Sequence, residues 1–134
     1  MKITDIPVET DDRYQLVSIT EEVKCAVREA GVEDGFCIIY STHTTAAVTV
    51  NEDYDRDVPR DLAAASRAFL DALDVRFEHG EGNSDSHFLT SLFGQSQTLL
   101  VRGGEPALGR WQGVFLAEFD GPRSRSVTVA VGAV

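Results

Sequence analysis

Apolar and polar residues follow two different spacings along the chain, and each spacing predicts one kind of element. Apolar positions at helical spacing predict three helices, at about 20–30, 57–72 and 84–94. Apolar runs bounded by turn-forming residues predict six strands, at 14–19, 36–40, 46–50, 98–102, 110–119 and 127–131. The mixture of helices with closely spaced strands indicates an α+β fold.

The residues at the helix boundaries support this assignment. Thr20 is expected to cap the first helix, and Gly31 is placed to end it in a left-handed conformation. Ser84 or Asp85 is expected to cap the third helix. The last third of the chain reads as strands alone, so we expect one α+β domain over residues 1–134. Its core should be a largely antiparallel sheet, sandwich-like or barrel-like, with a few helices.

Charge narrows the choice of partner and compartment. The 134 residues include 22 acidic and 12 basic side chains, for a formal net charge of -10. Such a chain repels a phosphate backbone, so we expect no nucleic-acid partner. No apolar run approaches the roughly 20 residues that span a bilayer, and the first residues lack the apolar core of a signal peptide. We therefore expect a soluble cytoplasmic protein without a membrane partner.

The two cysteines do not indicate a disulfide or a metal site. Cys25 and Cys37 are too few for a disulfide scaffold and lack the spacing of a zinc ribbon or redox pair. We expect both to be small buried side chains, as free cysteines usually are.

The three histidines, His43, His79 and His87, all lie in polar segments. Zinc and similar ions bind imidazole nitrogens, and three protein ligands leave a fourth position for water or substrate. The three residues could therefore share a metal site. Their spacing matches no known zinc-binding motif, and from spacing alone three separate surface histidines are the simpler explanation.

Carboxylates and amides near the histidines could orient the imidazole N–H groups. These residues are Glu81 and Asn83 near His79, and Asn51 and Glu52 at the end of the strand that follows His43. Turns and helix caps are the alternative explanation, and the better one for Asp53, Ser84 and Asp85.

The strand at 110–119 and the turn after it carry further candidates. Alternation places Glu118 and Asp120 at neighbouring positions on one face, where they could exchange a proton or hold a cation, or be simply solvated. Arg123 and Arg125 follow on a tight turn and could bind a phosphate or carboxylate. Salt bridges to the two acids explain these arginines equally well.

Five short segments together resemble the YjbQ family. They are STHTTA at 41–46, VNE at 50–52, HGEGN at 79–83 with the following His87, LGRWQ at 108–112 and EFDGPR at 118–123. Each segment is weak evidence by itself, but their order and intervals cover nearly the whole chain. Where the family pattern usually places a small residue before the Trp-Gln pair, this chain has Arg110, which affects the expected size or charge of the pocket.

The resemblance implies an α+β homotrimer with a metal-containing pocket at or near the subunit interface. It also implies thiamin phosphate synthase activity on small phosphorylated metabolites, with a physiological role that is not settled. The implied cofactor is a divalent metal ion, zinc in first place, with magnesium for the pyrophosphate. The residues implied by matching positions are the metal ligands His43, His79 and His87, the catalytic candidates Glu118, Asp120 and Glu81, and the substrate-binding candidates Thr44, Thr45, Asn51, Glu52, Asn83, Gln112 and Arg123.

Two other functions are compatible with the same residues. An ion held by three neutral imidazoles would also suit a hydrolase of a small ester or phosphate. A trimer that binds a metal or metabolite without catalysis is the third reading. An ion with four protein ligands would indicate a structural role, whereas a bound water would leave catalysis available.

Overall fold

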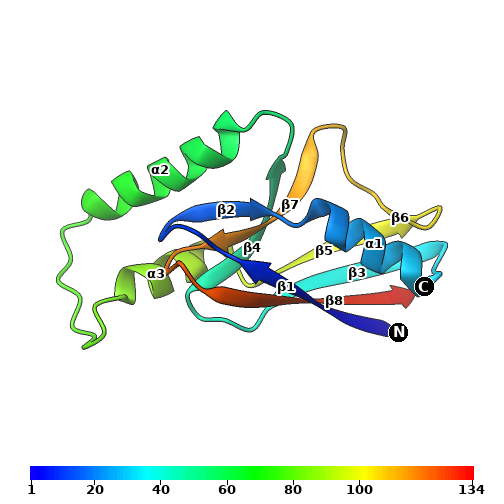
Figure 1. The fold of residues 1–134 in the computed structure, drawn as a ribbon, viewed down its shortest axis with the longest axis horizontal. Coiled ribbons are helices and arrows are strands. Elements are labelled where there is room, and N and C mark those ends of the chain that lie inside the picture. Colours follow the sequence, from blue (N-terminus) through cyan, green and yellow to red (C-terminus); the bar gives the residue numbers. More distant parts are fainter.

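All 134 residues are described by a computed structural model, in which two antiparallel sheets are combined with three helices (Figure 1). The five-stranded sheet has the order β1-β8-β3-β5-β6, and the three-stranded sheet has the order β2-β7-β4. The strands are β1 (Lys2–Glu9), β2 (Gln15–Ser18), β3 (Asp34–Ser41), β4 (Ala46–Glu52), β5 (Ser96–Arg102), β6 (Glu105–Pro106), β7 (Gln112–Glu118) and β8 (Ser124–Ala133). The helices are α1 (Thr20–Ala30), α2 (Asp57–Asp71) and α3 (Ser84–Phe93). The expected α+β class with an antiparallel core is confirmed.

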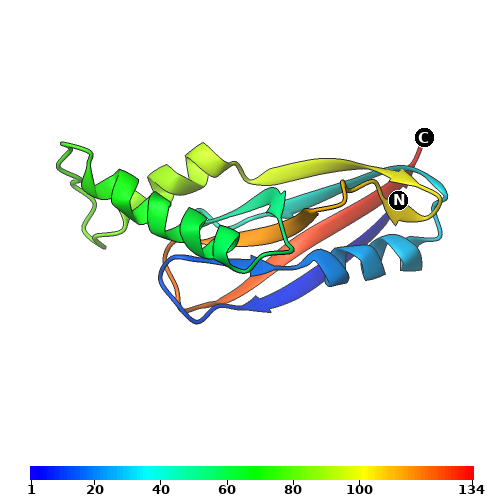
Figure 2. The same ribbon diagram turned by 90° about the horizontal axis from the view of Figure 1, so that it is seen from above.

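Two apolar cores lie on opposite faces of the three-stranded sheet. Val114 and Leu116 of β7 join the main core, which also contains inward residues of the five-stranded sheet and the apolar face of α1. Phe115 and Phe119 join the second core, which packs against α2 and α3. The predicted alternation along this strand therefore decides which helices cover which face. Figure 2 shows α2 running beside β2.

The three helices all lack the length and the apolar character of a membrane-spanning helix.

Strand β1 is absent from the sequence prediction. Only Ile6 and Val8 of this segment are buried, and Pro7 lies between them. A proline usually argues against a strand, but β1 pairs only with β8 and is an edge strand, where proline is tolerated. The short apolar alternation was therefore too weak a signal for the strand.

Several local predictions are wrong. Thr20 is the first residue of α1 and not its cap, because its hydroxyl donates instead to the Asp53 carboxylate at 2.6 Å. The residue before α3 is Asn83, and neither Ser84 nor Asp85 caps that helix. Cys25 is exposed on the outer face of α1, whereas Cys37 is buried as expected.

A buried ion pair joins the two sheets. Glu118 ends β7 and is fully buried, and Arg125 near the start of β8 is 8% exposed. The Arg125 Nε donates to Glu118 Oε1 at 2.8 Å, and its Nη2 donates to Oε2. The salt-bridge explanation for Arg125 is therefore the observed one.

Two threonines complete this buried network. The Thr10 hydroxyl, in the connection after β1, donates to Glu118 Oε1 at 2.8 Å. Thr45, just before β4, accepts from Arg125 Nη2 at 2.8 Å. Burial alone would raise the pKa of Glu118, but the hydrogen bonds from Arg125, Thr10 and the Asp120 N–H outweigh it and lower that pKa. The ionised carboxylate and its arginine thus join the chain around Thr10 and Thr45 to the turn between β7 and β8.

We expect Leu89→Ala to lower the free energy of unfolding by about 2–5 kcal/mol, because it opens a cavity in the second core. Leu89 of α3 is 1% exposed in that core, whereas Leu92 of the same helix is 57% exposed. Leu92→Ala is therefore the matched control, with an expected loss under about 0.5 kcal/mol. Denaturant unfolding measures both, and equal losses would show that α3 is not anchored through Leu89.

We expect Glu118→Gln to cost about 3–5 kcal/mol of unfolding free energy near pH 7, because it leaves the Arg125 charge buried without its partner. The lowered pKa means that ionised Glu118 stabilises the fold above its unfolded value of about 4.3, and that this contribution disappears as the pH falls through the folded-state pKa. The difference between wild type and variant should therefore shrink below about pH 4.

Urea unfolding of both proteins from pH 3 to 8 measures this difference. Glu22→Gln, at an exposed position on α1 without an ion pair, is the control and should change little at any pH. A Glu118→Gln penalty that stays constant down to pH 3 would contradict the assigned charge state.

Candidate functional site

The clearest cluster of candidate residues lies where the loop before α3 meets the turn between β7 and β8. The rings of His79 and His87 lie edge to face, with 5.7 Å between their centroids. Asn83 precedes α3, and its Nδ2 donates to Asp120 Oδ2 at 2.9 Å. Arg123 Nη2 donates to the same oxygen at 3.1 Å. We call His79, Asn83, His87, Asp120 and Arg123 the histidine corner.

The histidine corner contains a free acceptor. Asn83 is 7% exposed, and its side-chain oxygen is buried without a hydrogen-bond partner. Most buried polar atoms are paired, so an orphan of this kind needs a partner that the chain alone does not supply. A ligand donor or a coordinating cation could satisfy it. Arg123 also keeps an exposed guanidinium, although its Nε donates to the Asp120 carbonyl at 2.7 Å.

Glu81 contributes little to the geometry of the corner. Its carboxylate accepts from Asn83 Nδ2 at 3.4 Å and lies 4.0 Å from His79 Nε2. The Glu81 side chain is 73% exposed, so solvent weakens both interactions.

His43 is placed differently from the other two histidines. It lies in the connection between β3 and β4, and its Nε2 accepts a hydrogen bond from the Ser126 N–H at 3.1 Å. Its pKa is lowered by partial burial and by the positive charge of Arg125. His43 is therefore neutral near pH 7, and its Nε2 lone pair is already used by the Ser126 N–H, so this nitrogen could bind a metal only after that contact breaks.

The donor set fits a metal ion only in part. The His79 and His87 rings are close enough in space to bind one ion together. Imidazole nitrogens are common ligands of zinc. His43 does not join them, and no group of three or more His, Cys, Asp and Glu side chains is arranged to hold an ion within one chain. The single chain thus brings together two of the three expected metal ligands.

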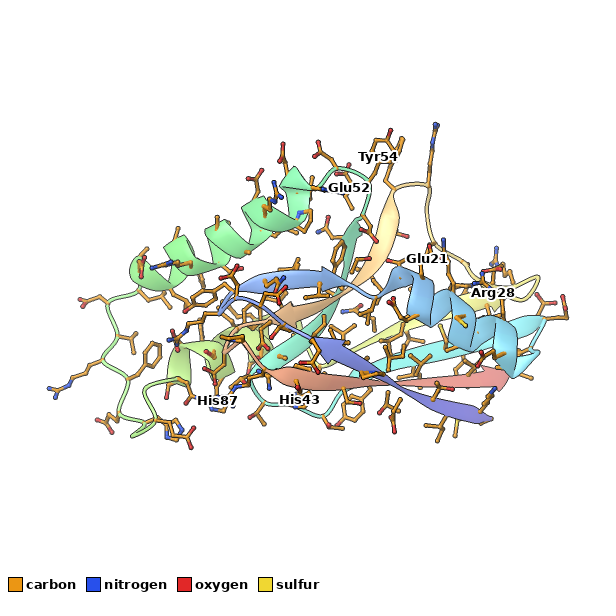
Figure 3. The ribbon with its side chains drawn as sticks, viewed as in Figure 1. Glu21, Arg28, His43, Glu52, Tyr54 and His87 are labelled. Carbon is orange, nitrogen blue, oxygen red and sulfur yellow. The ribbon has the colours of Figure 1, made fainter.

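Three other expected substrate-binding residues lie at the opposite end of β4. Asn51 and Glu52 end this strand, and Glu52 is paired in register with Gln112. Ala46, at the other end, is paired with Glu118, six residues and roughly 20 Å away at about 3.3 Å per residue. In Figure 3, Glu52 lies at the upper edge of the molecule, and His43 and His87 lie at the lower edge. Within one chain, the residues expected to share a single pocket therefore lie at two opposite ends of β4.

The end of β4 that carries Asn51 and Glu52, which we call the Glu52 end, combines an unpartnered carboxylate oxygen with exposed aromatic rings. One carboxylate oxygen of Glu52 is buried without a hydrogen-bond partner. Tyr54 and Trp111 are exposed beside it and lie edge to face at 4.8 Å, and the Arg110 guanidinium covers the Trp111 ring at 4.6 Å. The Asn51 Oδ1 accepts from the Glu52 N–H at 2.7 Å. Gln112 Oε1 accepts from the Gly109 N–H at 2.8 Å, which ties it to its own turn.

The remaining candidates are either part of the buried network around Glu118 and Arg125 or exposed to solvent. Both Glu118 oxygens are used by Arg125, Thr10 and backbone N–H groups, which favours a structural role over proton exchange. Thr45 is buried against Arg125, and Thr44 is exposed.

Sequence reasoning missed the residues that fix α3 beside β2. Asp85 was expected as a cap, but its carboxylate accepts from Arg13 Nη2 at 3.1 Å and from the Tyr14 hydroxyl at 2.9 Å. The Asp85 contact and burial raise the pKa of Tyr14, with burial as the larger cause. These partners are about 70 residues apart in sequence, so no local signal could have paired them.

Comparison with protein families and known proteins agrees with the resemblance. The family model described as UPF0047 protein YjbQ-like matches residues 4–133. The UPF0047 protein of Methanocaldococcus jannaschii is 45% identical over 127 residues, covering 92% of this chain and 89% of that protein. The UPF0047 protein YugU of Bacillus subtilis is 39% identical over 124 residues, covering 90% and 92%.

Solved structures show the same fold. A YjbQ/UPF0047 family protein of Clostridium acetobutylicum superposes with a TM-score of 0.91 at 40% identity, covering 96% of this chain and 99% of that one. A hypothetical protein of Aeropyrum pernix K1 gives a TM-score of 0.92 at 29% identity over the whole of both chains. The family model, the sequence relatives and the shared fold together establish that this chain belongs to the YjbQ-like UPF0047 family.

Proposed function

We propose that the protein is a cytoplasmic enzyme that joins a pyrimidine diphosphate to a thiazole phosphate, forming thiamin phosphate. The observation that carries the proposal is the histidine corner. Its two imidazoles lie 5.7 Å apart, and Asn83 and Arg123 share one oxygen of Asp120, with the amide oxygen of Asn83 buried and unpartnered. The guanidinium and a metal ion held by the imidazoles are suited to binding and neutralising a phosphorylated substrate, and the amide oxygen can accept a hydrogen bond from a substrate N–H.

The reaction makes limited demands on the protein. The thiazole nitrogen lone pair forms a bond to the pyrimidine methylene carbon, and the bond from that carbon to the diphosphate oxygen breaks. The bonding electrons leave with the pyrophosphate, so the step requires no proton transfer. The protein must therefore align two rings and stabilise the charge of the leaving group.

The residues of the histidine corner divide these tasks. His79 and His87 would hold a divalent metal ion, with a third ligand from His43 after it releases the Ser126 N–H or from another chain. When bound, that ion supplies positive charge to anionic oxygens. Arg123 presents hydrogen-bond donors to a phosphate. Asp120 acts as a positioning residue, because one of its oxygens holds both Asn83 and Arg123.

We also propose that the protein is a homotrimer in which two chains complete each site. The supporting observation is the division of the candidate residues between the two ends of β4. In a cyclic trimer each chain presents one surface to one neighbour and a different surface to the other. The Glu52 end of one chain can therefore lie against the histidine corner of the next. The outer face of the five-stranded sheet, with Tyr40 and Leu100 exposed, is available for such contact.

We expect purified protein to form thiamin phosphate from the two precursors in the presence of a divalent metal, and His87→Ala to lose at least about tenfold in kcat/KM. Phe88→Ala, at the next and more exposed position of α3, is the control and should stay within about twofold. Product is measured by mass spectrometry, and metal content by elemental analysis of both variants.

The outcomes separate the three functions. A wild type that forms no product would overturn the synthase. Metal-dependent turnover of chromogenic esters or phosphates in its place would identify a hydrolase. Stoichiometric metal that is lost in His87→Ala, without any turnover, would identify a binding protein.

We expect mixtures of His87→Ala and Glu52→Gln subunits to regain activity that neither variant has alone. If each site combines the histidine corner of one chain with the Glu52 end of another, some sites in a mixed trimer contain no altered residue. The variants are unfolded together, refolded and assayed, and light scattering checks for a mass of three chains. Activity no greater than the sum of the separate variants would show that each chain builds its site alone.

A further inference from the structure

Three arginines that lack ion-pair partners line one cavity between α2 and β2. Six of the twelve lysine and arginine side chains form ion pairs with carboxylates. Of the other six, Arg56, Arg60 and Arg67 all line a cavity of about 750 Å³. In a chain with a net charge of -10, this concentration of unpaired cations is unexpected.

The helix geometry explains why these arginines share one side. Arg56 directly precedes α2 and has a helical backbone conformation. Positions 56, 60 and 67 are separated by four and seven residues, which places them on one side of the helix. The same face carries the small residues Ala63 and Ala64, which also line the cavity. Small side chains beside long charged ones leave the space between helix and strand unfilled. The cavity is therefore a direct consequence of the α2 sequence.

The carboxylates of the cavity do not neutralise the three arginines. Three carboxylates line the cavity. Asp53 accepts from the Ser18 and Thr20 hydroxyls, Asp55 accepts from the Asp57 N–H at 2.9 Å, and Asp12 is exposed and forms no ion pair. No ion pair within 4.0 Å joins any carboxylate to Arg56, Arg60 or Arg67. Their guanidinium groups therefore keep all their donors for a ligand.

The lining also has an apolar part. Leu16 and Phe115, both buried, contribute to it, and the exposed Tyr54 ring lies at its edge. The volume lies in the range of pockets that bind small organic molecules. Guanidinium forks bind phosphate oxygens in pairs, whereas the apolar surface suits a ring or carbon skeleton.

We propose that this cavity is a binding site for an organic anion carrying two or more phosphates. It is separate from the histidine corner but next to it, because Arg67 also lines a neighbouring cavity that contains His79. The arginines of α2 hold the phosphates, and Leu16, Phe115 and Tyr54 contact the organic part. This binding needs no metal, because the positive charge comes from the protein. It does not depend on the proposed synthase activity.

Isothermal titration calorimetry with inorganic pyrophosphate and with ADP, both in EDTA, tests the site. We expect Arg56→Gln/Arg60→Gln to weaken pyrophosphate binding by about tenfold or more, because two charge-assisted contacts are lost. Arg76→Gln/Arg102→Gln removes the same charge from two unpaired arginines outside the cavity and should change the affinity less than about threefold. Circular dichroism confirms that both variants are folded.

Two further comparisons locate the ligand. ADP should bind more tightly than pyrophosphate, because only ADP has an organic part for the apolar lining. His79→Ala/His87→Ala should bind pyrophosphate in EDTA as the wild type does, which separates this site from the histidine corner. A wild type that binds neither probe, or equal losses in the two arginine pairs, would overturn the proposal. ADP binding no tighter than pyrophosphate would overturn the assignment of an organic ligand.

Discussion

The ion pair between Glu118 and Arg125 is the constraint on which the arrangement of the two sheets depends. A charge in the protein interior is stable only when it is paired and hydrogen-bonded, and here each partner comes from a different sheet. The donors of Arg125 also fix Thr45 at the start of β4, and Glu118 fixes Thr10 after β1. In this placement of the strands, each of these buried polar groups has a partner.

This placement also determines the environment of the neighbouring site residues. Partial burial, together with the positive charge of Arg125, lowers the pKa of His43, so the imidazole beside the buried pair stays neutral. The backbone N–H groups of Phe119 and Asp120 donate to Glu118, which holds the start of the turn that presents Asp120 to Asn83. The contacts of Glu118 thus favour a positioning role over the proton transfer expected from the sequence, because both of its oxygens hold the polar groups around it.

Much of the fold could be predicted from the sequence, because local periodicity reports burial directly. The alternation along β7 and the apolar face of α1 are confirmed. On α2, by contrast, Leu62, Ala63 and Leu70 pack against the second core, whereas Phe69 is 48% exposed. The errors occur where a long-range partner overrides a local preference. Thr20 was expected to cap a helix but donates its hydroxyl to Asp53. Asp85 was likewise expected as a cap but accepts hydrogen bonds from Arg13 and Tyr14. Strand β1 has too few apolar positions to be predicted from its own sequence, and its strand conformation depends on pairing with β8.

The candidate site could be predicted less well, because motifs identify residues but not their separation. Asn83 and Asp120 meet because α3 packs on the second core, and nothing in either segment indicates this contact. Asn51 and Glu52 are close to His43 in sequence, but a fully extended strand carries them to the far end of the sheet. A strand cannot fold back on itself, so the proposal that these groups act together requires two chains. The straight course of β4 is therefore the structural reason to seek the complete site in the assembly.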